Sequence, residues 1–499
     1  MTTHPFQIIP CGLLPTYLEQ MPKGLQENHT TLFRSRRKAE RWFASVFIRA
    51  TIFIVIVLLY PSFSVGTMAQ STPDRSLISA ADLNFLTAMT RDVLEQSRIY
   101  PNQVVSDNFG ANGTGGTLIR PGGRDAYPSF WVRDYAMALE TGMISLEEQK
   151  HMLFLTAAAQ ADQSWITSGG SLIPLGSIPD HIRIDDGLPI YFPGTYSYEL
   201  QGTKEWGILP PLGDAFLFIH MAHYLIRTQN EEGILEEIVK GKSLMDRLLM
   251  AFHVSPAREE NHLVFCTESL RGVDFGFRDA IQITGDLLYP SVLKFRAAKQ
   301  LSDIFDRIGN KAMSGNYFQI AVSIQEAVPA VFQDPSGLLR ASSGSSNQPD
   351  VWGTALAVYE GLLQGEARDT ACRVLAEAYE NGTLSYRGNI RHVLTSHDFD
   401  ADRVWEKSMA PKNQYQNGAY WGTPVGWVAH AVHQVDPEAA RKLVSEYIAE
   451  LKENDFRKGA AFGAPYECFN PEGYSQNPVY LSSVASPLAV FLKMKREGK

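Results

Sequence analysis

The sequence predicts an all-α fold of about twelve helices. From residue 77 to the C-terminus, segments such as 77–94 carry apolar residues three and four positions apart, the spacing that forms the buried face of a helix. No series of alternating strands appears, although short hairpins would fit within the loops. Long loops rich in glycine, proline and aromatic residues follow every second helix, which places them on one face of the fold.

The predicted helices follow one another with few interruptions. Ser145-Leu-Glu-Glu148 begins one of them with a capping-box pattern. The full set covers about 77–94, 130–142, from 145 onward, 212–228, 230–252, 284–308, 310–333, 350–364, 366–380, 420–434, 436–453 and 480–494. Such a chain fits a solenoid, two bundles or a closed double ring of hairpins. In a ring the one-sided loops would surround a single pocket, although a solenoid also accepts insertions on one face.

The first seventy residues differ from the rest. Six basic residues between Arg34 and Arg49 precede an uncharged apolar run, residues 50–69, that ends in small residues. This order is typical of a secretory signal, and the run is just long enough to cross a bilayer of about 30 Å. We therefore expect 1–70 to be a basic N-terminus with a signal peptide or membrane anchor. The helical domain, 76–499, is then exported, because positive charge stays on the cytoplasmic side.

Composition and absent motifs exclude several function classes. The formal net charge of −9 argues against nucleic acid as a partner, since phosphate binding needs a basic surface. The four cysteines show no metal-ligand spacing, and His181 has no partner at such a spacing, so neither a metal nor another cofactor is expected. GxxxxGK[ST], HExxH and GxSxG are all absent, which removes the usual support for phosphate-loop, zinc-peptidase and α/β-hydrolase chemistry.

The most distinctive segment is RPGGRDAYPSFWVRDY, residues 120–135. Its glycines allow a ligand to approach the backbone, its arginines can hold hydroxyls or carboxylates in a fork, and its aromatic rings can stack on apolar faces. This mixture suits an uncharged, polyhydroxylated ligand such as a sugar. Related mixtures recur in four later loops, around 176–214, 268–279, 413–427 and 463–473.

Acidic residues in these loops are candidates for acid–base chemistry. Asp274 or Asp279 could act as a general acid if a hydrophobic surrounding raises its pKa. Glu467, between Tyr466 and Cys468, could be a base directed at water. Tyr420 and Trp421 offer stacking surfaces beside the amides of the same loop.

Five segments, in this order, resemble the signatures of known glycosidases. Pro121-Gly-Gly-Arg with Trp131 and Asp134-Tyr135 resembles the first trehalase signature, and Trp131-Val-Arg-Asp134 resembles the W-x-R-D element of glucoamylases. Glu268-Ser, Gly272-Val-Asp274 and Arg278 are similar to the acid-bearing segment of trehalases and related α-glucosidases. Gln416-Asn-Gly with Trp421 resembles a later signature of the family, and Tyr466-Glu-x-Phe-Asn-Pro resembles the region where inverting members carry a base.

The resemblance spans about 80–499 and implies the six-hairpin glycosidase superfamily with its (α/α)6 toroid. By that implication Asp274 is the general acid and Glu467 the general base. The residues implied to bind the sugar are Arg124, Trp131, Asp134, Arg278, Asn417 and Trp421. The chain departs from the trehalase pattern at Arg133, where a tryptophan is expected, and extra residues separate Glu268 from Asp274. Asp279 therefore remains an alternative acid.

The predicted function is an exported, inverting glycoside hydrolase acting on an α-glucoside-like oligosaccharide or disaccharide. Inversion requires two carboxyl groups about 6.5–9.5 Å apart, with room for a water molecule. One alternative is a polysaccharide lyase or unsaturated-uronyl hydrolase on the same toroid, in which the arginines would bind a uronate. A second is a sugar-binding protein without catalysis, tethered to a membrane through residues 50–69.

Overall fold

The computed structural model describes residues 76–105, 109–124, 127–193, 195, 204–272, 276–397 and 405–498. Residues 75–499 form one compact unit, and residues 1–74 are grouped separately. The predicted signal or anchor at 50–69 lies outside the described residues, and so does Asp274. Within the described ranges, no helix combines the length and the apolar character needed to cross a membrane.

The described residues contain twelve α-helices, close to the predicted positions. They are α1 (Ala80–Ser97), α2 (Val132–Ala138), α3 (Leu146–Ala159), α4 (Asp214–Gln229), α5 (Leu244–Val254), α6 (Leu288–Arg307), α7 (Lys311–Phe332), α8 (Val351–Tyr359), α9 (Gly365–Glu380), α10 (Val425–His433), α11 (Pro437–Glu453) and α12 (Ser482–Arg496). Short 3-10 helices include η1 (Leu139–Thr141), η3 (Glu232–Glu236), η4 (Glu268–Leu270), η5 (Thr395–His397) and η6 (Phe456–Lys458).

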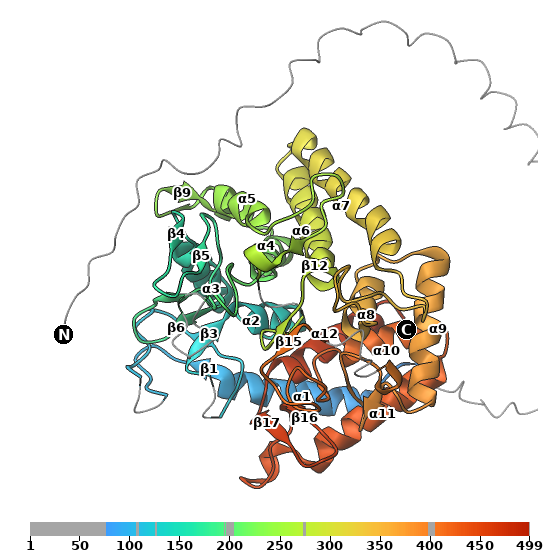
Figure 1. The fold of residues 1–499 in the computed structure, drawn as a ribbon. Coiled ribbons are helices and arrows are strands. Elements are labelled where there is room, and N and C mark those ends of the chain that lie inside the picture. Colours follow the sequence, from blue (N-terminus) through green and yellow to red (C-terminus); the bar gives the residue numbers. More distant parts are fainter. Residues whose placement is uncertain are drawn as a thin grey trace, which may run out of the picture. The chain divides into compact units, whose positions relative to one another are not determined.

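The even-numbered helices form a closed cycle. Each of α2, α4, α6, α8 and α10 contacts the next one, and α12 returns to α2. The odd-numbered helices pack against this ring, with α3 and α5 on α4, α7 on α6, α9 and α11 on α10, and α1 on α12. Figure 1 shows the red C-terminal helices returning to the blue first helix. Six helical hairpins closed in this way have the arrangement of an (α/α)6 toroid.

Eight small antiparallel sheets accompany the helices in the loops of the described chain, so the fold is mainly rather than wholly helical. The three-stranded sheet has the order β3 (Ser129–Trp131), β6 (His181–Arg183), β7 (Pro189–Ile190). The pairs are β1 (Arg98–Ile99) with β2 (Leu118–Ile119), β4 (Trp165–Ile166) with β5 (Leu172–Ile173), β8 (Ile238–Val239) with β9 (Lys242–Ser243), β10 (Phe265–Cys266) with β12 (Gly285–Asp286), β11 (Ile281–Gln282) with β15 (Lys407–Ser408), β13 (Ser385–Tyr386) with β14 (Asn389–Ile390), and β16 (Tyr466–Phe469) with β17 (Ser475–Pro478).

Serine side chains fix the starts of several helices. Ser79, Ser145 and Ser243 each accept a hydrogen bond from the backbone N–H three residues later, which satisfies a donor that the helix itself leaves free. At Ser145 the Glu148 carboxylate completes the predicted capping box.

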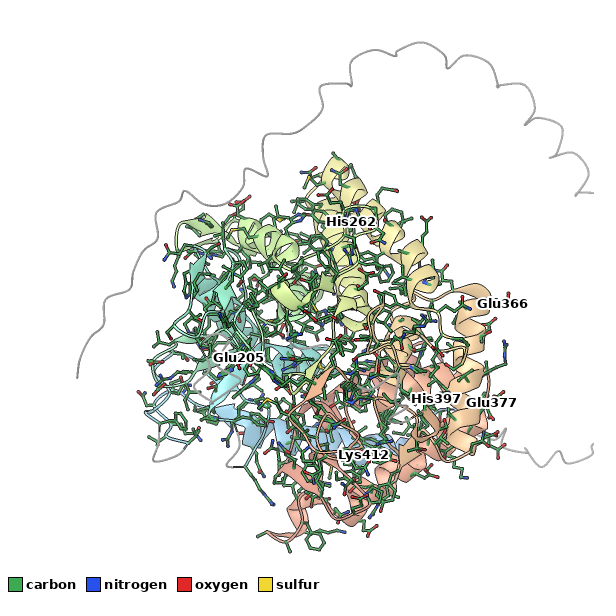
Figure 2. All side chains as sticks on the ribbon, viewed as in Figure 1. Glu205, His262, Glu366, Glu377, His397 and Lys412 are labelled. Carbon is green, nitrogen blue, oxygen red and sulfur yellow. The ribbon has the colours of Figure 1, made fainter. Side chains whose placement is uncertain are left out.

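The outer helix α9 shows the expected amphipathic pattern. The labelled Glu366 and Glu377 mark its exposed face, while the opposite face packs into the core (Figure 2).

The prediction of a helix over 230–252 was wrong in its first half. The chain there forms η3 and the β8–β9 hairpin, and α5 begins only at Leu244. The hairpin turn places Lys240 and Gly241 at φ 46° and 80°, in the left-handed region that interrupts a helix.

The ring places its long loops at one end. The segments that lead into the even-numbered helices are 98–131, 160–213, 255–287, 333–350, 381–424 and 454–481, whereas those that leave them have at most fourteen residues (230–243). The predicted alternation of long and short connections is therefore present. All the long segments meet at the N-terminal ends of the inner helices, and this is where the candidate site lies.

Candidate active site

Three inner helices present an aspartate at this end. Asp134 lies in the first turn of α2, Asp214 is the first residue of α4, and Asp350 is the N-cap of α8. The partial positive charge at a helix N-terminus favours an anion there. The long loops add Asp180, Asp279 and Glu467. The electrostatic contacts described below bring Asp134, Asp180, Asp214 and Asp279 around one arginine, and Asp134 and Asp279 also act on Glu467.

Glu467 is held by two donors at a single oxygen. Tyr127 Oη donates to Oε2 at 2.7 Å, and Asn477 Nδ2 donates to the same oxygen at 2.5 Å and to Tyr127 Oη at 2.8 Å. Glu467 on β16 lies opposite Asn477 on β17, as the register of Tyr466 with Pro478 and of Cys468 with Gln476 requires. In the part of the chain that the structure describes, Oε1 accepts no hydrogen bond.

The pKa of Glu467 is raised to about 7. Burial is the largest cause, since the side chain is 1% exposed and water no longer solvates its charge. The hydrogen bonds from Tyr127 and Asn477 oppose the rise, and the negative charges of Asp134 and Asp279 add to it. The group therefore changes charge near neutral pH.

The backbone around Glu467 is strained. Tyr127, Asn477 and Val479 have φ values of 60°, 41° and 63°, in the left-handed region, which costs a non-glycine residue about 1–3 kcal/mol. The cost is greatest for Val479, because it is β-branched. Two of these residues bind Glu467, so the strain lies where the carboxylate is positioned.

Asp134, one of the predicted sugar-binding residues, faces the same centre. Its Oδ1 accepts hydrogen bonds from Tyr480 Oη at 2.6 Å and from Ser482 Oγ at 3.1 Å. Burial raises its pKa, against the opposing effect of Arg133 and of these two donors. Ser482 is the first residue of α12 and Tyr480 lies two residues before it, so Asp134 also joins the first inner helix to the last.

Asp279 is the more accessible of the acids, since it is half-buried whereas Glu467 and Asp134 are almost fully covered. The Gln416 amide nitrogen donates to Asp279 Oδ1, and the Gln416 carbonyl accepts from the Ala280 N–H at 2.7 Å. Trp206 Nε1 donates to the Asp279 carbonyl at 2.9 Å. Burial raises the pKa of Asp279, while Arg133 and Gln416 act against the rise.

Arg133 is the cation at the centre of these groups. Burial alone would lower its pKa, but Asp214, Asp180, Asp134 and Asp279 together raise it. Its guanidinium carbon lies 4.6 Å from the centre of the Phe277 ring, and a guanidinium nitrogen lies 3.5 Å from Asp180 Oδ1. Four aspartates surround this one arginine, so carboxyl groups outnumber the cation at the site.

Asp214 is fully buried beside this arginine. Within the described residues neither of its carboxylate oxygens has a hydrogen-bond partner. Its pKa is accordingly raised well above the usual value, first by burial, although Arg133 counters the effect.

Two stacked rings lie beside the acids. Trp131 and His181 are cross-strand partners in the β3–β6 pair, and their rings stack 4.2 Å apart at an angle of 19°. Tyr127 meets Trp131 edge-on at 4.9 Å, and Asp180 Oδ2 lies 2.8 Å from His181 Nδ1. Trp131, predicted to bind sugar, thus forms an aromatic wall next to Glu467.

Three other predicted residues lie beneath this region. Arg278 is fully buried, with a guanidinium nitrogen 2.5 Å from Asp350 Oδ1. Asn417 Nδ2 donates to the Ala410 carbonyl at 2.8 Å. Trp421 is 0% exposed and packs against Trp352 at a ring distance of 5.7 Å. These contacts support the loops around the acids.

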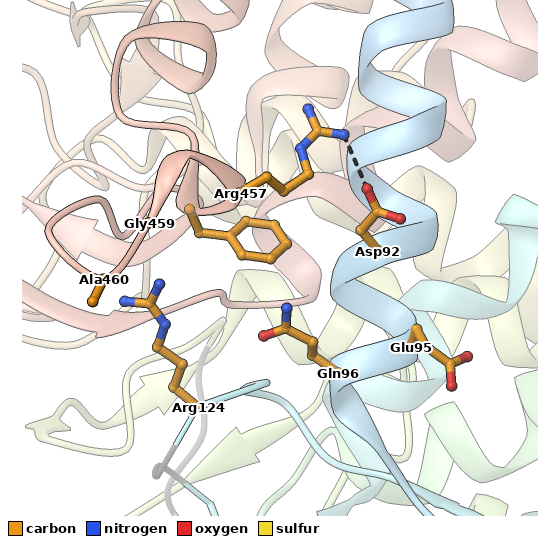
Figure 3. Close-up of a pocket in the computed structure, with 8 residues that line it drawn as sticks. Asp92, Glu95, Gln96, Arg124, Arg457, Gly459 and Ala460 are labelled. Atoms are coloured by element: carbon orange, nitrogen blue, oxygen red, sulfur yellow. Dashed lines mark hydrogen bonds and ion pairs between the residues drawn. The ribbon is translucent and has the colours of Figure 1, made fainter.

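Arg124 lies apart from the acids. It lines a surface groove of about 750 Å³ between α1 and the η6 loop, together with Gln96 and the Arg457–Asp92 ion pair. Figure 3 shows the Arg124 guanidinium beside Ala460, and Gln96 on the helix that also carries Asp92 and Glu95. Arg124 acts electrostatically on Tyr466, the neighbour of Glu467 in β16, whereas Arg133 is the cation among the four aspartates.

The predicted acid, Asp274, lies outside the described residues, whereas its alternative, Asp279, lies in the cluster. Sequence reasoning did not assign roles to Tyr127, Arg133, Asp214 or Asn477. The only available signals were the tyrosine and arginine within residues 120–135 and the Gly213-Asp214 helix start. Over the described ranges, no group of three His, Cys, Asp or Glu residues could hold a metal ion.

Comparison with known proteins gives structural neighbours only. No family model matches the chain, and no curated protein matches it by sequence. One similar solved structure is a rhamnosidase from Klebsiella oxytoca with rhamnose bound, at a TM-score of 0.48 and 11% identity, covering 84% of this chain and 65% of that one. Another is a GH78 family rhamnosidase of Bacillus sp. GL1, at a TM-score of 0.47 and 11% identity, covering 84% of this chain and 35% of that one. The chain therefore spans less than two thirds of either neighbour.

Proposed function

We propose that this chain is an inverting glycoside hydrolase that acts on an uncharged, α-glucoside-like oligosaccharide or disaccharide. Because the structural neighbours have TM-scores below 0.5, the support for this function comes from the geometry of the site. The observation that carries it is Glu467, a buried carboxylate with its pKa raised to about 7, whose Oε2 is occupied by two donors next to further buried acids.

Glu467 is the proposed general base. Because Tyr127 and Asn477 occupy Oε2, we expect the proton taken from water to be accepted by Oε1. The water oxygen then attacks the anomeric carbon, and the bond from that carbon to the leaving oxygen breaks. Glu467 must be ionised for this step, so activity is expected to rise as the pH passes about 7.

Asp279 is the proposed general acid, which gives its proton to the leaving oxygen. Asp279 is half-buried, unlike the other acids of the cluster, and burial raises its pKa, which is the direction that a general acid requires. Family resemblance favours Asp274 instead, and substitution of each residue separates the two. The base and the acid together conserve protons, since one is taken from water and one is given to the leaving group.

The charge of the site favours an uncharged substrate over a uronate. Asp134, Asp180, Asp214 and Asp279 all act on Arg133, and Arg278 is paired with Asp350. Neither buried arginine is therefore placed to receive a sugar carboxylate alone. Carboxylates of the site that are ionised would stabilise the positive charge that develops on the sugar ring in glycoside hydrolysis.

We further propose that the domain acts outside the cytoplasm. The support is the basic segment followed by the apolar residues 50–69, which would direct export or tether the domain to the membrane.

The function is tested by measuring monosaccharide release from a panel of α- and β-linked neutral oligosaccharides. The wild-type protein is compared with Glu467→Gln, Asp279→Asn and Asp274→Asn. We expect a loss of about 10²–10⁴-fold for Glu467→Gln and for Asp279→Asn, with the fold checked by circular dichroism. A loss with Asp274→Asn but not with Asp279→Asn moves the acid to Asp274. Absence of release from every neutral sugar, with new ultraviolet absorbance from a uronate polymer, overturns the hydrolase in favour of a lyase.

A further inference from the structure

The Gln416 side chain contacts Asp279 and its neighbour at two adjacent points. The amide nitrogen donates to Asp279 Oδ1, and the amide oxygen accepts from the Ala280 N–H at 2.7 Å. The second bond fixes the orientation of the amide, because a backbone N–H donates to the oxygen and not to the NH2 group. Gln416 is 1% exposed, so water competes little for either bond. The amide donor therefore faces one defined oxygen of Asp279.

The main chain around Asp279 is also held in place. Trp206 Nε1 donates to the Asp279 carbonyl at 2.9 Å, and the Met409 N–H donates to the Ala280 carbonyl at 2.9 Å. The strand β11 begins at the next residue, Ile281, and pairs with β15. Because the backbone is fixed on both sides, the carboxyl group moves only through its own side-chain torsions.

The turn that carries Gln416, residues 413–418, is held by a buried arginine. Asn413 and Gly418 have φ values of 64° and 117°, in the left-handed region. Arg391, which is 3% exposed, donates from Nε to the Gly418 carbonyl at 2.6 Å and from Nη2 to Asn413 Oδ1 at 2.9 Å. A Cβ on Gly418 would collide with Arg391 Nη2. The position of Gln416 is therefore set by contacts of its turn and does not depend on Asp279 alone.

Several elements bring charged or titratable groups to Asp279. They are Arg133 on α2, Asp180 before β6, Asp214 on α4, Tyr415 on the same turn as Gln416, and Glu467 on β16. Burial and Asp180 raise the pKa of Asp279, whereas Arg133 and the Gln416 donor lower it. Arg133 is shared among four aspartates. In the described part of the chain the Gln416 amide nitrogen donates to Asp279 alone.

We propose that Gln416 is the positioning residue of the general acid: it keeps the proton of Asp279 on Oδ2 and stabilises the carboxylate that remains after proton transfer. This role rests on the proposed function of Asp279. An N–H group directed at Oδ1 makes that oxygen an acceptor, so the proton of the neutral acid lies on Oδ2.

The same bond assists the transfer itself. As the Oδ2–H bond breaks and the leaving oxygen takes the proton, negative charge forms on the carboxyl group. The bond from Gln416 then becomes charge-assisted and stronger. Gln416 neither gives nor takes a proton, and Asp279 is a stronger acid with this donor than burial alone would leave it.

Gln416→Met tests this role, because methionine keeps the length of the side chain and removes both hydrogen bonds. Gln414→Met is the matched control, since Gln414 lies on the same turn and its side chain makes no hydrogen bond among the described residues. The full-length protein is labelled with ¹³C at the aspartate carboxyl groups, and the Asp279 resonance is identified by its absence in Asp279→Asn. We expect the titration midpoint of Asp279 to rise by about one pH unit in Gln416→Met and to stay unchanged in Gln414→Met.

An unchanged Asp279 midpoint in Gln416→Met overturns the role of Gln416. Gln416→Glu gives the same test with the backbone bond retained, because its carboxylate still accepts from the Ala280 N–H. It replaces the donor to Asp279 with a second acid, so the midpoint should rise at least as far as in Gln416→Met.

The pH profile of kcat/KM provides the kinetic readout. Its basic limb, where the general acid loses its proton, should move upward with the Asp279 midpoint in Gln416→Met. We expect kcat to fall by about three- to tenfold, with KM within about twofold of the wild type. A loss of activity without movement of the basic limb overturns the positioning role. Absence of hydrolysis by the wild type overturns the proposed function instead, and the titration of Asp279 still decides whether Gln416 sets its acidity.

Discussion

At the residue scale, burial and hydrogen bonding have opposite effects on the pKa of Glu467. Burial raises its pKa, and the donors Tyr127 and Asn477 limit the rise and occupy one oxygen. The carboxylate can therefore be ionised close to neutral pH and still present Oε1 for a proton.

Tyr127→Phe should move the pH dependence of the reaction. The variant loses a hydrogen bond to a charged acceptor, which is worth about 1.5–3 kcal/mol, so the pKa of Glu467 rises further. We expect the acid limb of the kcat/KM profile to shift upward by about one pH unit. A uniform decrease at every pH would instead indicate a purely structural role.

Tyr379→Phe is the matched control. Tyr379 Oη donates to Glu446 Oε1 at 2.9 Å, between α9 and α11, and neither residue is among the groups that act on Glu467. This variant also loses a hydrogen bond from a tyrosine to a carboxylate, but the pH profile of kcat/KM should match that of the wild type.

The buried ion pair between Arg278 and Asp350 can be tested by replacing the arginine. Arg278→Met leaves Asp350 buried without its partner, and we expect a loss of about 3–5 kcal/mol in the free energy of unfolding, measured in urea. Lys311→Met breaks the Lys311–Asp306 pair, whose side chains are 74% and 53% exposed, and should cost under about 1 kcal/mol. Similar losses in both variants would contradict the assignment of Arg278 to a buried ion pair.

Sequence motifs identified part of this site because they are local. Residues 120–135 contain Trp131 and Asp134, and Glu467 stands in its own short motif. Tyr127 and Asn477 could not be assigned, because the bond from Tyr127 to Glu467 joins residues 340 positions apart. A single sequence carries no signal for such a pairing.

At the element scale, hairpins join the loop side of the fold to the outer helices. Gly388, in the β13–β14 turn, has φ 72°, and a Cβ there would lie 2.1 Å from the Tyr447 nitrogen on α11. The turn can approach α11 this closely only because residue 388 is a glycine.

Gly388→Ala should therefore destabilise the protein by about 3 kcal/mol or more, through both the left-handed φ and the clash. Gly382→Ala is the control, because Gly382 has a similar φ of 68° with no atom near its Cβ position. That variant should lose only about 1 kcal/mol. If Gly388→Ala and Gly382→Ala lost the same free energy of unfolding, by thermal or urea unfolding, the clash at residue 388 would be relieved without an energetic cost.

Most helices were predictable because their period and their caps are local. Ser145 begins its helix at the expected place, and the helix predicted from residue 77 begins at Ala80, after the Ser79 cap. The α5 prediction failed because the Lys240-Gly241 turn, rather than apolar spacing, sets where that helix begins. The small sheets could not be located in advance, because most of their strands have only two residues, too few to show an alternating pattern.

At the scale of the whole molecule, ring closure joins the two ends of the described domain. The contact of α12 with α2, and the bonds from Tyr480 and Ser482 to Asp134, close the ring beside the acids. The helix pattern alone left a solenoid, two bundles and a ring open, and the resemblance to glycosidases implied the ring. Only contacts between distant helices decide among them.

Buried carboxyl groups should make the stability of the domain depend on pH. Glu450 on α11 is 3% exposed, and burial raises its pKa to about 7. Because the folded-state pKa lies above the unfolded value, its contribution is fully present below about pH 4.5 and is lost as the pH rises through about 7. The change corresponds to about 3 kcal/mol.

Glu450→Gln should remove this dependence. In urea unfolding, the free energy of unfolding of the variant minus that of the wild type should be about 3 kcal/mol larger at pH 8 than at pH 4.5. Glu438→Gln, at an exposed position in the same helix, should differ from the wild type by the same small amount at both pH values. If the free energies of unfolding of Glu450→Gln and the wild type differed by the same amount at both pH values, Glu450 would not titrate near neutral pH.

The most direct test of the proposed reaction is the anomeric configuration of the first product. A neutral oligosaccharide cleaved by the wild-type protein is followed by proton NMR during the first minutes, before mutarotation, with Glu467→Gln alongside. We predict that the released sugar has the anomeric configuration opposite to that of the bond cleaved, and that Glu467→Gln releases almost none. A product that retains the configuration, or one formed as fast by Glu467→Gln, would contradict the assignment of Glu467 as the base.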